Sequence, residues 1–358
     1  GAQDPYPLMP PPPASAPTIT SGSLTHTDIT YQSAVIQWTT DQVSSDHRVF
    51  YGFQSDLSDG VWSDYLNGTD SVSIQLTGLT PYSTVYYQAY SYNGDDHGLF
   101  SSSNITSFDT PRAPVVWHVD DDLAEYPLAD YQTIMEAVNA SISDDAIVIH
   151  EGYYVEDVVL DKKLNLTGIN YPRLEANLSH GVHVKSQGCV LENLNITAGN
   201  SFDAVNIGYS GAFSWSDCGQ TTVTGCELFD SQSGVYVNPG SNDCNITQCN
   251  IRRNGVGVHL YRSDNTLVNG SDVYYNGKGV VIQSGKQNTV SNSRLVNNSG
   301  AYGLQIYEYL GIPCQDNRVE YNHFLNNELS IGANVVGSVI TRNGFSVESS
   351  PSTPFPSN

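Results

Sequence analysis

Carboxylates and histidines are the side chains of this chain best suited to metal or acid–base chemistry, and they are scattered. Asp120, Asp121 and Asp122 form a run of three carboxylates, the oxygen ligands that Ca²⁺ prefers. Consecutive residues point in different directions, so such a run is a poor single site. We assign no metal ligand and no cofactor, and keep a weak calcium site as an alternative.

Three histidines of the C-terminal half, His180, His259 and His323, are each isolated in the sequence. Polysaccharide hydrolysis needs two carboxylates, and elimination needs a base beside groups that bind a uronate. Between residues 181 and 345 no Asp-Asp pair occurs, and the basic residues are thinly spread. We therefore predict no catalytic residue and no enzyme. A polysaccharide lyase or hydrolase is the alternative.

The six cysteines all lie in the C-terminal two thirds of the chain. None forms a Cys-x-x-Cys zinc or redox motif. Cys226 and Cys249 occupy equivalent places in successive repeats, where neighbouring strands lie about 4.8 Å apart. We predict a Cys226–Cys249 disulfide and a Cys218–Cys244 disulfide, with free buried thiols as the alternative.

Sequons of the form Asn-x-Ser/Thr are slightly more frequent than chance predicts, which favours a glycosylated protein of the cell exterior. Two of them, at Asn139 and Asn165, are expected to be too buried for modification. The predicted glycosylation sites are Asn67, Asn104, Asn177, Asn195, Asn245, Asn269 and Asn297.

A repeat supplies the framework for these residues. From Ser233 to Asn298 the sequence reads as three successive lines that each begin near Gly, alternate apolar residues and close on Asn254, Asn276 or Asn298. A fixed period with Gly and Asn at the corners indicates a solenoid of stacked coils. The pattern extends from Gly181 to about residue 345, giving about seven coils. Stacked Asn side chains, including Asn327, are expected to hydrogen-bond along the corner.

Composition limits the class of protein. The formal charge of −23 with only 14 Lys and Arg disfavours nucleic acid as a partner, since phosphate binding requires basic residues. No segment has the about 18 consecutive apolar residues of a membrane span. Charged residues make up only 14% of the chain, so a polar surface of Ser, Thr, Asn and Tyr is expected.

Residues 17–112 predict seven short strands, with clear alternation at residues 35–38 and 72–76. The segment 76–87 resembles the corner of fibronectin type III domains in which Leu-x-Pro precedes a tyrosine. Leu79 and Pro81 match that pattern, whereas Val85 stands where the tyrosine is usual. Trp38 takes the place of the buried tryptophan. The resemblance implies a β-sandwich that serves as a spacer or adhesive unit.

Residues 115–168 contain aspartates, a helical segment with Thr133, Ile134 and Ala137, and then the segment Asp145–Tyr153. This order resembles the capped entry of secreted right-handed parallel β-helices, a group that includes pectin-active enzymes and archaeal surface proteins. Ile134, Ala137 and Val138 share one face of an amphipathic helix. The resemblance implies that this helix covers the open end of the solenoid.

The sequence thus predicts an all-β chain: a Pro-rich arm (1–16), a fibronectin type III-like sandwich (17–112), a right-handed parallel β-helix with an N-terminal capping helix (113–345) and a Ser/Pro tail (346–358). We predict a secreted, non-enzymatic glycoprotein of the cell surface, with attached glycans and identical subunits as its partners. It would assemble into a layer, sheath or filament, and a glycan-binding adhesin is a further alternative.

Overall fold

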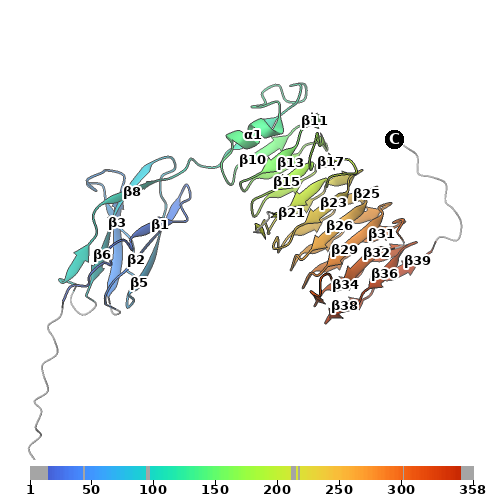
Figure 1. Cartoon of the computed structure of the whole chain (residues 1–358). Helices are drawn as coiled ribbons and strands as arrows, with labels where there is room; N and C mark the ends of the chain where they lie inside the picture. The colour runs from blue at the N-terminus through green and yellow to red at the C-terminus, as the bar shows by residue number, and fades with distance from the viewer. Residues whose placement is uncertain are drawn as a thin grey trace, which may run out of the picture. The chain divides into compact units, whose positions relative to one another are not determined.

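A computed structural model of the chain describes residues 15–42, 45–93, 97–210, 215–216, 218–300 and 302–347. The predicted arm 1–16 and tail 346–358 therefore lie almost wholly outside the described residues. The chain divides into two compact units, Gly1–Ala113 and Pro114–Asn358 (Figure 1). Among the described residues, no helix is long and apolar enough to cross a membrane.

The N-terminal unit contains two antiparallel sheets around a shared core. Trp38 is fully buried in this core, as predicted, and its Nε1–H donates to Ser91 Oγ at 2.9 Å. The first sheet has the order β1 (Thr25–Thr27), β2 (Ser33–Thr39), β5 (Ser71–Thr77). The second sheet has the order β4 (Val61–Trp62), β3 (Asp46–Gly52), β6 (Thr84–Tyr92), β7 (Phe100–Ser102), with β8 (Thr106–Asp109) also paired to β6.

The C-terminal unit is a solenoid whose three sheets run along the stack, and Figure 1 shows its strands following one another from β10 to β38. The ten-stranded sheet contains β9 (Val116–Val119), β10 (Ala146–Ile149), β13 (Asn165–Gly168), β16 (Val190–Glu192), β21 (Thr222–Thr224), β24 (Asn245–Thr247), β27 (Leu267–Asn269), β30 (Thr289–Ser291), β34 (Arg318–Glu320) and β38 (Val339–Thr341).

The second sheet of the solenoid has nine strands and lies along another side of the coils. Its strands are β11 (Tyr153–Val155), β14 (Arg173–Glu175), β17 (Asn195–Thr197), β22 (Glu227–Phe229), β25 (Asn250–Arg252), β28 (Asp272–Tyr274), β31 (Arg294–Val296), β35 (His323–Leu325) and β39 (Gly344–Ser346).

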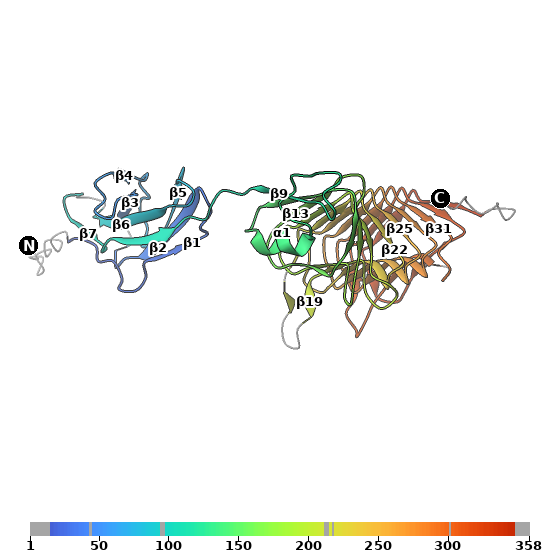
Figure 2. The same ribbon diagram turned by 90° about the horizontal axis from the view of Figure 1, so that it is seen from above.

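The third sheet has eight parallel strands, so the solenoid has about one coil more than the sequence predicted. Its strands are β12 (Val158–Leu160), β15 (Val182–Val184), β18 (Val205–Ile207), β23 (Ser233–Val237), β26 (Val256–Tyr261), β29 (Lys278–Gln283), β32 (Tyr302–Tyr307) and β36 (Glu328–Ile331). Two small pairs complete the strands: β19 (Tyr209–Ser210) with β20 (Trp215–Ser216), which Figure 2 shows projecting from the stack, and β33 (Cys314–Gln315) with β37 (Val335–Val336).

A single short helix, α1 (Ile134–Ala140), is found among the described residues. Thr133 caps it by accepting from the backbone N–H of Glu136, and this side-chain bond fixes where the helix begins. Ile134, Ala137 and Val138 are buried against the solenoid core, as predicted. The carboxylate of Glu156 accepts from the first two helical N–H groups, those of Ile134 and Met135.

The predicted asparagine ladder is confirmed. Asn254 donates its backbone N–H to Asn276 Oδ1 at 2.9 Å, Asn276 donates to Asn298 at 3.0 Å, and Asn298 donates to Asn327 at 3.1 Å. Left-handed backbone at these corners occurs one residue before each ladder asparagine, as at Tyr275 (φ 54°). The ladder asparagines therefore serve as hydrogen-bonding groups, and the residue before each makes the turn.

Candidate functional site

The outer face of the eight-stranded sheet carries a group of polar and aromatic side chains in mutual contact. Alternate residues of its strands face the core, as Val235 and Val237 do around Tyr236, so those between them face outward. The parallel register places one outward residue per coil in line, and we call this line the central row. It consists of His183, Asn206, Tyr236, His259, Val281 and Gln305.

Tyr236 and His259 form the aromatic pair at the middle of the central row. Their ring centroids lie 4.8 Å apart with the rings nearly perpendicular at 75°. His259 Nε2 lies 2.8 Å from Gln283 Oε1, an acceptor oxygen, so Nε2 carries the proton. Nδ1 of the neutral imidazole then carries the lone pair.

Burial sets the protonation of this pair. Desolvation lowers the pKa of His259, against smaller opposing effects of the Gln283 hydrogen bond and the Asp203 charge. Burial, with smaller contributions from Asp203 and neighbouring tyrosines, raises the pKa of Tyr236 to about 12. At neutral pH the site therefore holds an unprotonated base next to a protonated acid.

A buried carboxylate lies one coil away. Asp203 is 4% exposed and accepts from Asn206 Nδ2 through Oδ2 at 2.8 Å. Asn206 in turn accepts from Asn238 at 2.9 Å. Oδ1 of Asp203 is buried and has no hydrogen-bond partner among the described groups. A buried acceptor without a donor is costly, so this oxygen is an unsatisfied polar group beside the central row.

His180 borders the carboxylate. The backbone N–H of Asp203 donates to His180 Nδ1 at 3.1 Å, so that nitrogen is unprotonated. Its 3.4 Å approach to the Asp203 carboxylate is then a contact of a neutral ring and not an ion pair. Burial lowers the pKa of His180, which agrees with the neutral form. Burial also lowers the pKa of His183 to about 4.

Cationic and amide groups border the central row on both sides of the aromatic pair. Lys278 Nζ donates to Gln305 Oε1 at 3.0 Å, and its positive charge makes a small contribution to lowering the pKa of His259. The charge of Lys185 likewise contributes to lowering the pKa of His183. The face can therefore bind a carboxylate close to an acid–base pair.

Sequence reasoning treated His180 and His259 as isolated residues, and the structure brings both into this face. His323 lies on β35 of the nine-stranded sheet and bonds to Ser346 Oγ, so it takes no part. His183, Asp203, Tyr236 and Gln283 were not identified from the sequence. The signal that could have found them was the strand register across coils of unequal length.

The aspartate run lies beside the capped end of the solenoid. Carboxylate oxygens of Asp120, Asp121, Asp122 and Glu125 all lie within 4.8 Å of one another, contrary to the expectation that consecutive aspartates diverge. The carboxylate of Asp120 accepts from the backbone N–H groups of Leu123 and Tyr126. Through these hydrogen bonds, Asp120 stabilises the turn that follows it.

The predicted disulfides are not present, because all six cysteines are free and buried. Cys226 and Cys249 are equivalent in neighbouring coils. Their thiols are hydrogen-bonded to each other and are not joined by a disulfide bond. Cys244 is in register with Thr221, three residues after Cys218, so the second predicted pair is out of register.

Several sequons lie on the surface. Asn67, Asn104 and Asn177 are exposed, and Asn195, Asn245, Asn269 and Asn297 are partly buried at strand positions and corners. Asn139 and Asn165, which we expected to be buried, are exposed. Glycosylation at all of these positions stays a prediction.

A family model described as "Right handed beta helix region" matches residues 210–355. This match agrees with the solenoid and gives its handedness. No curated protein matches the chain.

Among solved structures, the A-module of a mannuronan C-5 epimerase from Azotobacter vinelandii is 14% identical, with a TM-score of 0.44, over 57% of this chain and 59% of that module. An alginate lyase from Paenibacillus is 16% identical, with a TM-score of 0.38, over 58% of this chain and 71% of the lyase. A family 28 exopolygalacturonase from Yersinia enterocolitica is 13% identical, with a TM-score of 0.33, over 92% of this chain and 74% of that enzyme. With TM-scores below 0.5, these likenesses carry no weight for function.

Proposed function

We propose that this protein acts on a uronate-bearing polysaccharide by proton transfer at the outer face of the eight-stranded sheet. The observation that carries the proposal is the Tyr236–His259 pair, a neutral base and a protonated acid in contact on neighbouring coils. It takes up the alternative of a polysaccharide-active enzyme, whereas the sequence, with no aspartate pair and thinly spread basic residues, favoured a non-enzymatic role.

The proposed reaction is a β-elimination. His259 Nδ1 removes the proton on C5, the carbon next to the uronate carboxylate, and the C5–H electrons form the C4–C5 double bond. The C4–O4 bond breaks, and the Tyr236 hydroxyl donates its proton to the departing oxygen. Lys278 and the neighbouring amides stabilise the charge that develops on the carboxylate during this step.

The shape and charge of the face favour this substrate class. Successive coils present one outward side chain about every 4.8 Å, so a linear chain of sugars can lie along the row. Asp203 is the carboxylate whose charge raises the pKa of both Tyr236 and His259. Hydrolysis requires two carboxylates at the scissile bond, so elimination fits the described residues better.

The experiment is incubation of the purified chain with alginate, polygalacturonate and a neutral glucan, followed by ultraviolet absorbance of the unsaturated uronate. Absorbance should rise with at least one uronate polymer and stay flat with the glucan. Proton NMR of the same samples detects inversion at C5 without cleavage. If neither product forms across a panel of uronate polymers, the proposal is wrong.

The surface-layer or filament role is a second candidate, with one observation in its favour. The last coil leaves apolar side chains in contact with solvent, with Ile340 39% and Phe345 58% exposed, although their equivalents Val319 and Phe324 are core residues. A second copy that stacks on this end would cover them. Electron microscopy of native material tests this, and single unassociated particles at all concentrations would count against it.

A further inference from the structure

The second sheet of the N-terminal unit has an outward face built from aromatic rings, which the proposed function does not use. The register places Arg48 opposite Tyr90, Phe50 opposite Trp62 and Tyr92 opposite Phe100, all on the side away from the buried Val49 and Ala89. We call this face the aromatic platform and define it by Arg48, Trp62, Tyr65, Tyr90, Tyr92 and Phe100.

The rings of the platform are in mutual contact and partly open to solvent. Trp62 and Tyr90 have centroids 4.9 Å apart, and Tyr92 and Phe100 lie 5.6 Å apart. Trp62 is 41% exposed, Tyr65 44% and Phe100 50%. Large apolar rings that remain exposed together mark an interaction site more often than a structural one.

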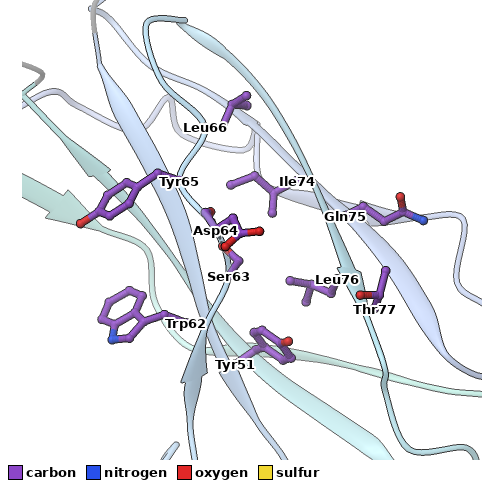
Figure 3. A pocket seen from close by; sticks show the side chains of 10 residues that line it. All are labelled: Tyr51, Trp62, Ser63, Asp64, Tyr65, Leu66, Ile74, Gln75, Leu76 and Thr77. Atoms are coloured by element: carbon purple, nitrogen blue, oxygen red, sulfur yellow. Dashed lines mark hydrogen bonds between the residues drawn. The ribbon is translucent and has the colours of Figure 1, made fainter.

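Figure 3 shows which way these rings point. Trp62 and Tyr65 project from one side of the segment 62–66, and Ile74 and Leu76 lie across the opposite side, around a hollow between this segment and β5. Ile74 and Leu76 belong to the core of the unit. The two rings therefore face outward and do not fill the hollow.

Arg48 gives the platform a charge. Its guanidinium carbon lies over the rings of Trp62 and Tyr65, 3.6 Å and 4.7 Å from their centroids. Its one hydrogen bond to a described residue is from Nε to the Tyr92 hydroxyl at 3.2 Å. None of the described carboxylates is paired with it. The nearest acid along the strand, Asp46, is paired with His97 at 2.7 Å.

These features select one class of ligand. A guanidinium stacked on aromatic rings keeps its in-plane N–H groups available, and two such groups bind a carboxylate in a bidentate manner. Flat exposed rings next to that cation suit the apolar face of a pyranose. In a chain with a formal charge of −23, an arginine that pairs with none of the described carboxylates and lies among exposed rings is the charge complement of an anionic group.

We infer that the aromatic platform is a second glycan-binding site, which takes an acidic polysaccharide by stacking sugar rings on Trp62, Tyr65 and Phe100 and pairing a uronate carboxylate with Arg48. This inference is independent of the proposed elimination, because it depends on other residues in the other unit.

The test is affinity electrophoresis of the full chain through gels that contain polygalacturonate, alginate or a neutral glucan. Trp62→Ala and Phe100→Ala should each weaken retention by an acidic polymer about tenfold. Arg48→Met keeps the stem that packs on the rings and removes the charge, so it should abolish the preference for acidic over neutral polymer. Tyr82→Ala, which removes an aromatic side chain 85% exposed and outside the platform, should be retained like the unchanged protein.

Two results would overturn the inference. One is unchanged retention of all three platform variants, each shown to be folded by its melting temperature. The other is equal retention of the unchanged protein by acidic and neutral gels. Turnover of short uronate oligosaccharides, measured in parallel, should be unaffected by the platform variants. If the unchanged protein is retained by the acidic gels but does not turn over uronate oligosaccharides, the result counts against the proposed elimination and leaves the platform inference standing.

Discussion

Tyr236 and His259 carry different halves of one proton transfer, so each should be needed for it. We expect Tyr236→Phe and His259→Gln each to reduce turnover of a uronate polymer by about 100-fold, the usual contribution of a general acid or base. Tyr274→Phe on the nine-stranded sheet is the matched control and should leave turnover unchanged. Equal turnover in all three variants would remove the pair from the mechanism.

The protonation of the same pair predicts the pH profile of that turnover. The base must be unprotonated, and the lowered pKa of His259 places its loss below about pH 6.5, the ordinary value for histidine. The acid must be protonated, and Tyr236 stays so until pH approaches its pKa of about 12. Turnover should thus fall on acidification and persist in mild alkali. An acidic optimum would contradict the assignment.

His183 couples stability to pH. Its pKa is about 4 in the folded chain against 6.5 for an unperturbed histidine. Between these values the unfolded chain binds a proton that the folded chain does not, so stability present above pH 6.5 is lost as pH falls towards 4. We expect His183→Gln to lessen the loss by about 2 kcal/mol, measured by urea unfolding across this range. His323→Gln is the control and should keep the original slope.

At the scale of the element, the asparagine ladder was predictable and the site was not. Asn254, Asn276 and Asn298 end successive lines of equal length, so the period alone placed them together. The coil that joins Asn206 to Tyr236 is longer than the one that joins Tyr236 to His259, and it includes the β19–β20 hairpin. Sequence spacing therefore gave no sign that Asn206 shares the row, which strand register shows. The equal lines did place Tyr236 and His259 at equivalent positions, but their chemistry as a pair was not recognised.

The ladder also has a measurable energy. Asn276 Nδ2 donates to the carbonyl of Ile251 at 3.0 Å, and its Oδ1 accepts from the backbone of Asn254 at 2.9 Å, all in the interior. Asn276→Ala removes the acceptor of the buried Asn254 N–H and one donor to the Ile251 carbonyl, and should lower the free energy of unfolding by about 2–4 kcal/mol. The exposed Asn177→Ala should change it by less than about 0.5 kcal/mol. Urea unfolding decides this, and equal losses in the two variants would mean that the ladder adds nothing.

At the scale of the whole molecule, the fold class was largely predictable. The strands and the stacked coils follow from alternation and turn chemistry. The buried Trp38 and the helix against the solenoid core were expected from the two family resemblances. The predicted disulfides are absent, because equivalence in a repeat predicts that Cys226 and Cys249 are neighbours but not that their thiols are oxidised. The fibronectin type III identity of the N-terminal unit stays a prediction, since two antiparallel sheets around one core agree with it without deciding it.

Free buried thiols predict how the whole molecule responds to redox conditions. Burial raises the pKa of Cys189 and of Cys314, so these thiols are poor nucleophiles in the folded chain. A reductant should leave the melting temperature unchanged, and a thiol reagent should label all six cysteines only after unfolding. A fall in melting temperature with reductant would show that disulfides form after all.

The extra residues around Tyr309 and Ile312 have a consequence for how such a chain can change over time. Asn288 still donates to Asn317 at 3.0 Å across that longer coil, so the added segment is absorbed at a corner and the coils on either side keep their register. Gene segments that encode whole coils could accordingly be duplicated or lost without disturbing what lies above or below. The number of sugar units that fit along the row would then be set by copy number rather than by redesign of any single residue.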